Sequence, residues 1–440
     1  MTHILDELAW RGLISQTTGD DALRAAIDAG PITLYCGFDP TAPSLHHGNL
    51  VQILTVRRFQ DAGHKPLLLV GGATGLIGDP NMSGERTLNP VDVVHGWVER
   101  IRAQIEPLMS FEGDNAAVMV NNYEWTKDLD AISFLRDVGK HFRMGTMLAK
   151  ENVARRLASD EGISYTEFSY QVLQGMDFLE LYRRYGCTLQ TGGSDQWGNL
   201  IAGTELTRKV EGVAVHGLAT PLITKADGTK FGKTEAGAVW LAPDMMSPYA
   251  FYQFWLNSDD ADVVNLLKVF TFRSREEIEA LGRAVADEPF KREAQRALAE
   301  DVTALVHGSA ALGAVVAASQ AIFGRGELAA LDAATLAGVA DSVPSAEVAA
   351  GTSFVDALVA VGLVESRSEA RRAIADGGAY LNNENVADPD FVLTTSAAIA
   401  GGWAVVRRGK KTVGLVRIGG AAGAATRPGA AGFDSAPGTP

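Results

Sequence analysis

The chain has 440 residues, too many for one hydrophobic core, so we expect two or three domains. Hydrophobic residues make up 46 % of it, which is enough for globular folding, and we expect neither a bilayer-spanning run nor an N-terminal leader. We therefore expect no membrane partner. The formal net charge of −14 argues against non-specific coating of nucleic acid, so we expect no DNA among the partners. A local basic patch can still bind RNA.

Cysteine usage indicates the compartment. Cys36 and Cys187 are the only cysteines in the sequence, too few for a disulfide framework or a cysteine metal cage. This usage is typical of a reducing environment, and we expect a cytoplasmic protein.

The first half of the chain alternates strand-like and helix-like segments. Apolar spacing predicts two helices within 3–30, a strand at 32–38, a helix at 50–61, a strand at 66–72, a helix at 91–108 and a strand at 116–121. There follow a region of helix-forming sequence at 130–185, a strand at 187–191 and a helix at 195–210. This rhythm predicts an α/β fold with a doubly wound parallel, Rossmann-like sheet.

The second half changes composition near residue 247. Residues 248–325 are rich in Ala, Leu, Glu and Arg, which favours helices, and 351–418 are compact and mixed. The expected divisions are a catalytic domain at 1–223, a mobile loop and connection at 224–247, an α-helical domain at 248–340, a linker at 341–350, a small α+β domain at 351–418, and a disordered Gly/Ala/Pro tail at 419–440.

The first candidate site is the loop at 35–49, between an expected strand and an expected helix. Such a turn presents free backbone N–H groups and a positive helix end, which favour phosphate. His46 and His47 stand where the loop enters the helix, and imidazole can donate a hydrogen bond to a phosphate oxygen. The alternative, a surface loop with two incidental histidines, is equally open from these residues alone.

The second candidate site is the stretch at 225–234, Lys-Ala-Asp-Gly-Thr-Lys-Phe-Gly-Lys-Thr. Its three lysines and two glycines, without an apolar face, suit a flexible clamp on polyphosphate. The alternative is a solvated hairpin tip, where lysines are common.

Together these stretches resemble a known family. The tetrapeptide at 46–49, His-His-Gly-Asn, resembles the HIGH signature of class I aminoacyl-tRNA synthetases, and Lys-Phe-Gly-Lys-Thr at 230–234 resembles their KMSKS signature. The flanking sequences at 35–41, 71–80 and 192–199 resemble those of bacterial tyrosyl-tRNA synthetases, and the similarity extends to about residue 418. Several long motifs in the right order make chance a poor explanation.

The resemblance implies that L-tyrosine and ATP form tyrosyl-adenylate and pyrophosphate, and that tyrosine then passes to the 3′ end of tRNA(Tyr). Positioning and electrostatics would supply the rate, with Mg²⁺ accompanying ATP, no protein metal ligands and no prosthetic group. The implied catalytic residues are His46, Asn49, Arg86, Lys230, Lys233 and Thr234. The implied ATP-binding residues are Gly37, Asp39, Thr41, His46, Gly48, Gly193, Asp195, Lys230 and Lys233.

The resemblance also implies a tyrosine pocket. Tyr35 and Asp177 would bind the phenol, and Asp79, Tyr170 and Gln174 the ammonium group, with Gln190 and Gln196 completing the site. A buried donor–acceptor pair left empty by phenylalanine is costly, and tyrosyl-tRNA synthetases are themselves the known example of such selectivity. From spacing alone, a polar stripe that faces solvent is the expected position of Tyr170, Gln174 and Asp177, which share one face of a helix. Asp195 is equally suited to a helix N-cap.

Two positions depart from the family pattern. Asn49 replaces the last histidine of the first signature; an amide still donates a hydrogen bond but carries no charge. The loop at 81–85 has no lysine, which leaves Arg86 as its basic residue.

The module at 351–418 resembles an S4-type RNA-binding domain. Its basic residues occur in two runs that could contact tRNA phosphates, and the alternative is an ordinary solvated charge run. The candidate tRNA-binding residues are Arg367, Arg371, Arg372, Arg407, Arg408, Lys410 and Lys411. Family members are homodimers, so we expect a homodimer.

Three other functions compete with this interpretation. A nicotinamide oxidoreductase is disfavoured because the glycines at 71–75 do not supply Gly-x-Gly-x-x-Gly. A tryptophanyl-tRNA synthetase would have no use for a phenol-binding pair. A non-catalytic RNA-binding protein on the same fold is disfavoured by the intact His46, Lys230 and Lys233.

Overall fold

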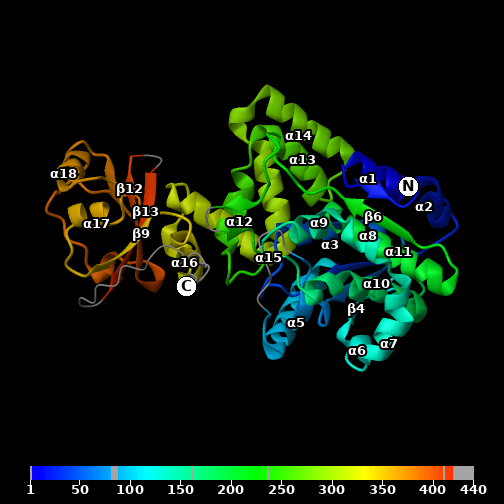
Figure 1. Ribbon diagram of the computed structural model, residues 1–440. Coiled ribbons are helices and arrows are strands. Elements are labelled where there is room, and N and C mark those ends of the chain that lie inside the picture. Colours follow the sequence, from blue (N-terminus) through cyan, green and yellow to red (C-terminus); the bar gives the residue numbers. More distant parts are fainter. Residues whose placement is uncertain (1, 81–87, 161, 235–236, 410–411, 420–440) are drawn as a thin grey trace. The chain divides into compact units, whose positions relative to one another are not determined.

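A computed structural model describes residues 2–80, 88–160, 162–234, 237–409 and 412–419. Figure 1 shows its helices and strands along the chain. The chain divides into two compact units, each treated by itself below. The first contains residues 1–232, 240–242 and 261–283, and the second contains 233–239, 243–260 and 284–440. The six-part division expected from composition stays a prediction.

The first unit is built on a six-stranded sheet with the order β1-β6-β5-β2-β3-β4. Neighbours from β6 to β4 pair in parallel, and only β1 is antiparallel, to β6. The strands are β1 (Gln16–Thr17), β2 (Thr33–Phe38), β3 (Lys65–Val70), β4 (Val118–Asn121), β5 (Cys187–Gly193) and β6 (His216–Thr220). Strands β3 and β6 are buried almost throughout, as expected of a sheet covered on both faces, and β3 is a continuous apolar run after Lys65. The predicted fold class is confirmed.

Helices α3, α5, α10 and α11 pack against these strands. The helices of this part of the chain are α1 (Ile4–Trp10), α2 (Asp20–Asp28), α3 (His47–Asp61), α4 (Thr74–Ile77), α5 (Val91–Ile105), α6 (Tyr123–Thr126), α7 (Ala131–Ser133), α8 (Met144–Leu148), α9 (Glu151–Leu157), α10 (Tyr165–Tyr185) and α11 (Trp197–Glu211). Sequence analysis missed β1, α4 and β6, and placed the start of α3 three residues too late.

Two further helices, α13 (Asp260–Phe270) and the larger part of α14 (Arg275–Asp287), belong to the first unit. Two buried arginines fix the C-terminal end of α13. Arg58 on α3 donates to the carbonyls of Val269 and Thr271 at 3.0 and 2.8 Å, and Arg11 donates to those of Lys268 and Thr271 at 2.8 and 3.0 Å. Helix C-termini leave carbonyls without intrahelical partners, and cations stabilise them. Helix α13 is therefore tied to the helix that begins at the first signature.

The second unit contains α12 (Pro248–Leu256), α15 (Glu293–Ile322), α16 (Ala333–Ala340) and a mixed module at its C-terminal end. A two-stranded hairpin joins β7 (Lys233–Thr234) to β8 (Gly237–Ala238). The module has a five-stranded sheet, β11-β10-β12-β13-β9, with α17 (Phe354–Ala360) and α18 (Arg367–Ala375). Its other strands are β9 (Ser345–Ala349), β10 (Ala379–Leu381), β11 (Glu384–Asn385), β12 (Trp403–Arg408) and β13 (Thr412–Gly419).

One element contradicts the sequence interpretation of this region. Strand β9 lies inside the stretch expected to be a linker and pairs in parallel with β13. The pairing partner lies about 70 residues further along the chain. The pairing of two strands so far apart in the chain leaves no local sequence pattern. The Pro and Ser residues at 342–345 therefore led to the prediction of a linker.

Within the described residues, one helical stretch, Pro289–Ile322, is long and apolar enough to cross a membrane by length and composition alone. The expectation that no such run exists is therefore wrong on that criterion. The stretch is interrupted at Gly308, whose φ of 86° and ψ of 160° are not helical, and it packs against α12 and α16. One such helix is weak evidence for a membrane span, because helices that do not cross a membrane can pass the same test.

Candidate active site

A pocket of ≈620 Å³ lies where the parallel strands β2 and β5 end. Its walls come from the loop after β2, the start of α3, the middle of α10, the turn between β5 and α11, and residues 221–223 and 230–231. The chain leaves β2 toward β3 and β4 and later returns to β5 and β6 on the other side of β2. Open α/β sheets bind their ligands at such a reversal of strand order.

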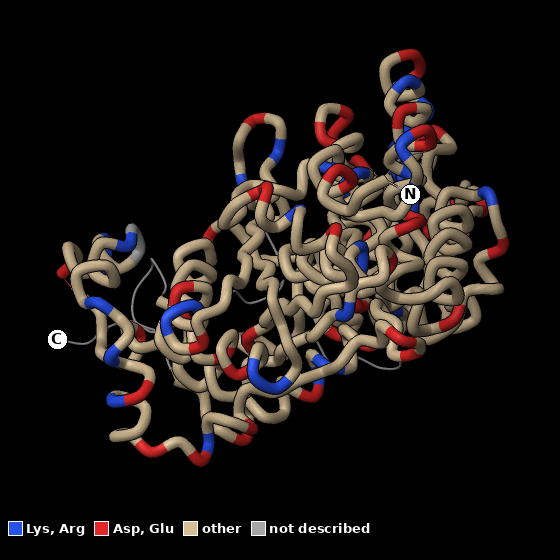
Figure 2. The backbone as a smooth tube through the Cα atoms, turned by 90° about the vertical axis from the view of Figure 1, so that its right-hand side faces the viewer, with Lys and Arg blue, Asp and Glu red and all other residues tan. Residues whose placement is uncertain are grey.

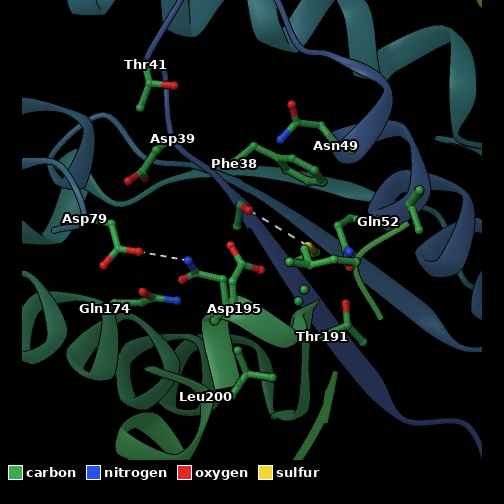
Figure 3. A pocket seen from close by; sticks show the side chains of 18 of the residues that line it. Phe38, Asp39, Thr41, Asn49, Gln52, Asp79, Gln174, Thr191, Asp195 and Leu200 are labelled. Atoms are coloured by element: carbon green, nitrogen blue, oxygen red, sulfur yellow. Dashed lines mark hydrogen bonds between the residues drawn. The ribbon is translucent and has the colours of Figure 1, made fainter. Parts of the chain in front are cut away.

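The pocket gathers most of the predicted site residues. Those that line it are Tyr35, Gly37, Asp39, Thr41, His46, Gly48, Asn49, Asp79, Tyr170, Gln174, Asp177, Gln190, Gly193, Asp195, Gln196 and Lys230. Figure 3 shows Asp79 and Gln174 on one side of it and Asn49 and Gln52 on the other. Arg86 lies outside the described residues, as do the side chains of Lys233 and Thr234, whose backbone forms β7 in the second unit.

One end of the pocket holds a buried carboxylate. Asp177 on α10 is 2 % exposed and accepts hydrogen bonds from the indole N–H of Trp125 at 2.9 Å and from the amide of Asn122 at 3.0 Å. Burial raises the pKa of Asp177 to about 7, although the two donors oppose the rise. The hydroxyl of Tyr35 is buried too and has no hydrogen-bond partner among the described residues. A buried polar group without a partner is costly, so this end suits a ligand that both donates and accepts.

A second corner is rich in acceptors. Asp79 accepts from Gln196 at 2.8 Å, and the side-chain oxygen of Gln174 is buried without a partner among the described residues. The hydroxyl of Tyr170 donates to Asp39 at 2.8 Å, which leaves its oxygen lone pairs for another donor. Carboxylate, amide and hydroxyl oxygens in one corner suit a ligand cation such as an ammonium group.

The first signature forms the N-terminus of α3. Ring nitrogen Nδ1 of His46 accepts the N–H of Gly48 at 3.0 Å, and the side-chain oxygen of Asn49 accepts the N–H of His46 at 3.0 Å. This reciprocal arrangement is a capping box. Burial lowers the pKa of His46, which favours the neutral ring. Because Nδ1 accepts a hydrogen bond, the proton of the neutral ring is on Nε2. Asn49 therefore caps the helix, a role that needs an amide oxygen and no charge.

The second signature begins on a hairpin. The N–H of Phe231 donates to the carbonyl of Ile223 at 3.2 Å, and Thr224 and Lys230 form an isolated antiparallel β-bridge. Ring nitrogen Nε2 of His47 lies 3.1 Å from the carbonyl oxygen of Phe231. Residues of the first signature and of the hairpin thus meet inside the first unit.

Both cysteines are free and buried, and Cys36 lines the pocket. Burial raises the pKa of the Cys36 thiol to about 12 and also raises that of Cys187. Neither is a thiolate at neutral pH, so neither suits nucleophilic catalysis.

Sequence analysis missed several residues that shape the pocket. Asn122 directly follows β4, so the rule that strand ends carry polar site residues could have found it. Trp125 lies in none of the motifs, and Thr74 lies in a motif but was assigned no role, because each acts through a contact to a residue far away in the sequence. Thr74 donates to Asp39 at 2.7 Å, over 35 positions.

In the second unit, the candidate tRNA-binding arginines do not form a free cationic face. Figure 2 shows acidic residues interspersed with basic ones along the chain. Arg367 pairs with Asp356, Arg371 with Asp390 and Arg408 with Glu369. Arg372 is exposed, whereas Arg407 is 8 % exposed with its guanidinium 5.0 Å from the ring of Tyr380. The assignment of Arg407 to the tRNA contact stays a prediction, and Lys410 and Lys411 lie outside the described residues.

Comparison with known proteins agrees with this geometry. The profile of the family "tRNA synthetases class I (W and Y)" matches residues 28–324, and that of the "Tyrosine--tRNA ligase SYY-like C-terminal domain" matches 335–416. The tyrosine–tRNA ligases of Streptomyces coelicolor and Acidothermus cellulolyticus are each 62 % identical to this chain, covering 96 % and 95 % of it and all of their own length.

Solved structures give the same result. A C-terminally truncated mitochondrial tyrosyl-tRNA synthetase from Coccidioides posadasii has a TM-score of 0.64 at 32 % identity, covering 72 % of this chain and 91 % of its own. A tryptophanyl-tRNA synthetase from Encephalitozoon cuniculi, with a TM-score of 0.53 at 14 % identity over 70 % of this chain and 84 % of its own, shares the fold.

A parallel sheet with the HIGH-like segment at the end of β2, and a hairpin at the start of the KMSKS-like segment, defines a class I aminoacyl-tRNA synthetase. The class is an enzyme class, as predicted. Within it, the chain belongs to the tyrosine–tRNA ligase family.

The raised pKa of Asp177 gives a pH prediction. The resemblance predicts that Asp177 accepts the substrate phenol, and a phenol donor favours the charged carboxylate. On this prediction, tyrosine binding releases the proton that Asp177 carries below its pKa of about 7. Equilibrium affinity for tyrosine should therefore fall as pH decreases below 7, by up to about tenfold per pH unit, and level off above 7.

Tyrosine binding measured by intrinsic fluorescence across this range checks the expectation. Phenylalanine, which lacks the hydroxyl, and the variant Asp177→Asn both serve as controls and should give flat profiles. A flat profile for tyrosine on the unmodified enzyme would contradict the assignment.

Proposed function

We propose that the pocket binds L-tyrosine and ATP together, joins them as tyrosyl-adenylate, and then passes tyrosine to the 3′ end of tRNA(Tyr). The observation that carries the amino-acid assignment is the unpartnered, buried hydroxyl of Tyr35 at the end of the pocket that also holds Asp177. Together they can accept and donate to one phenol. An indole has a donor only, so a tryptophan substrate would leave the Tyr35 hydroxyl unpaired.

In the first step, a carboxylate oxygen of tyrosine attacks the α-phosphorus of ATP. The bond from that phosphorus to the oxygen bridging to the β-phosphate breaks, and pyrophosphate leaves with the electron pair. The acceptor corner formed by Asp79, Tyr170 and Gln174 would hold the substrate ammonium, with Gln190 and Gln196 beside it. This corner orients the carboxylate without any covalent intermediate on the enzyme.

The nucleotide would lie along the loop after β2 and the start of α3. The Nε2 proton of His46 is free of the cap and can donate to a phosphate oxygen. Glycines at 37, 48 and 193 leave room for close approach of the ligand, and Thr41 and Asp195 line the same pocket. Asn49 supports this arrangement by capping α3. Charge that develops on the leaving pyrophosphate would be stabilised by Lys230, with Lys233, Thr234 and Arg86 in the same role.

Mg²⁺ is proposed to accompany ATP. Among the described residues there is no group of three or more His, Cys, Asp or Glu side chains able to hold a metal ion. Phosphate oxygens and water would therefore supply most ligands, as is common for this ion. The ion would neutralise charge on the departing phosphates.

The test is ATP–pyrophosphate exchange with each of the standard amino acids. Exchange should depend on tyrosine and on Mg²⁺, and Lys230→Ala should slow it at least about tenfold, with tyrosine affinity unchanged. Lys127→Ala, an exposed lysine outside the pocket, is the matched control. Exchange supported equally by another amino acid, or none at all, would contradict the proposal; the second result would favour a non-catalytic RNA-binding role.

We also propose a homodimer. Large apolar side chains gather on α7 to α10 and the turn between them while remaining exposed, including Ile132 at 71 %, Met144 at 58 % and Tyr165 at 70 %. Contiguous exposed apolar surface marks interaction sites, and most soluble oligomers pair like surfaces. Ile132→Asp should shift the mass measured by light scattering toward one chain, while Phe290→Asp, equally exposed in the second unit, should not. A monomeric unmodified protein would contradict this.

The second unit is proposed to contact tRNA phosphates through the exposed arginines Arg367, Arg371, Arg372 and Arg408. Replacing Arg372 with Ala should weaken tRNA binding and reduce its salt slope by roughly 1, while tyrosine-dependent exchange stays normal. Arg102→Ala, an exposed arginine in the first unit, is the control. An unchanged salt slope would remove Arg372 from the contact. Use of tRNA in translation supports a cytoplasmic location, which cell fractionation can check.

A further inference from the structure

The hairpin that carries Lys230 is held to the first unit by two side chains outside the proposed ligand contacts. The hairpin itself is small. The N–H of Lys225 donates to the carbonyl of Thr229 at 2.8 Å, and residues 224–230 are exposed, whereas Phe231 and Gly232 are buried. The position of such a short, exposed hairpin depends on its contacts with neighbouring elements, which include the packing of Phe231 near Phe270, with ring centroids 6.4 Å apart.

The first tether is His47. Its Nε2 lies 3.1 Å from the carbonyl oxygen of Phe231, and since a carbonyl can only accept, Nε2 carries the proton. The imidazole also meets the Phe231 ring edge-on, with centroids 5.7 Å apart at 79°. The second letter of the HIGH signature is isoleucine, which has no donor, so the histidine at 47 adds a bond that the signature itself does not provide.

Gly232 shows how closely the tether fits. A Cβ atom at this position would lie 2.0 Å from Cε1 of His47, and the φ of Gly232 is +78°. Both the approach of the imidazole and the backbone conformation therefore require glycine.

The second tether is Asp262 in the first turn of α13. It is 7 % exposed, and its Oδ1 accepts the N–H of Ala226 at 2.6 Å. The opposite end of α13 is fixed by Arg11 and Arg58, as described above. A buried carboxylate on a fixed helix thus holds the outgoing strand of the hairpin, while His47 holds the returning strand.

We propose that His47 and Asp262 are positioning residues, which hold this hairpin so that Lys230 stays at the phosphate end of the pocket. The inference rests on the proposed function of Lys230. Both tethers bind backbone atoms of the hairpin, so they act on Lys230 through its placement. Losing either lets the hairpin sample other positions, and Lys230 must then be ordered again each time the pyrophosphate leaves.

The experiment pairs a disruptive with a conservative variant at each tether. His47→Ile and Asp262→Ala each remove the bond, whereas His47→Gln keeps an N–H donor and Asp262→Asn keeps an acceptor oxygen. Three quantities are measured on the full chain: the single-turnover rate of tyrosyl-adenylate formation, tyrosine affinity, and the rate of tryptic cleavage at the hairpin lysines.

The disruptive variants should slow adenylate formation roughly fivefold and speed cleavage at the hairpin, with tyrosine affinity unchanged. The conservative variants should keep most of the rate of adenylate formation and most of the resistance of the hairpin to cleavage. In a Lys230→Ala background, His47→Ile should cause a smaller further loss of rate than in the unmodified chain, because one of the groups that it positions is gone.

The outcomes separate the two proposals. If Lys230→Ala leaves the rate normal, the role of Lys230 is wrong, and faster cleavage in the disruptive variants still supports the tethers. If Lys230→Ala slows the reaction but His47→Ile and Asp262→Ala change neither rate nor cleavage, the tethers are overturned. The same conclusion follows if the conservative variants are as slow as the disruptive ones.

Discussion

The parallel pairing of β2 with β5 is the constraint on which the rest of the first unit depends. Tyr35 is opposite Gln190 in this pairing, and Cys36 is opposite Thr191. Because both strands run the same way, their carboxyl ends open at the same edge, although about 150 residues separate them in the chain. The loops that follow them therefore share one pocket, and neither loop could build it alone.

The pocket is polar at a cost to the fold. Asp177 is kept from water, and the hydroxyl of Tyr35 and the amide oxygens of Gln174 and Gln190 are buried without partners among the described residues. Such groups destabilise a folded protein unless a ligand completes their hydrogen bonds. Their concentration around one cavity, with Asn122 and Trp125 holding the carboxylate in place, is the arrangement expected of a selective binding site.

Much of this was predictable from the sequence, and the exceptions have physical causes. The apolar runs of β2 and β3 predicted the sheet, and the two signatures predicted the nucleotide end of the pocket. The other pocket residues came from the family resemblance, because spacing alone placed Tyr170 and Asp177 on a solvent-facing stripe, whereas both are buried. The start of α3 was missed because a capping box uses His46 and Asn49, which look like loop residues. Strand β9, the donors to Asp177 and the burial of Arg407 depend on contacts between distant residues, which no local pattern encodes.

The burial of the two cysteines has a practical consequence. With a thiol pKa of about 12, Cys36 is ionised in roughly one molecule in 10⁵ at neutral pH, and Cys187 is less ionised still. Oxidants and maleimide reagents act on exposed thiolates, so we expect both buried cysteines to react slowly in the folded chain. A cysteine introduced at an exposed site would then carry a spectroscopic label alone, without first removing the native pair.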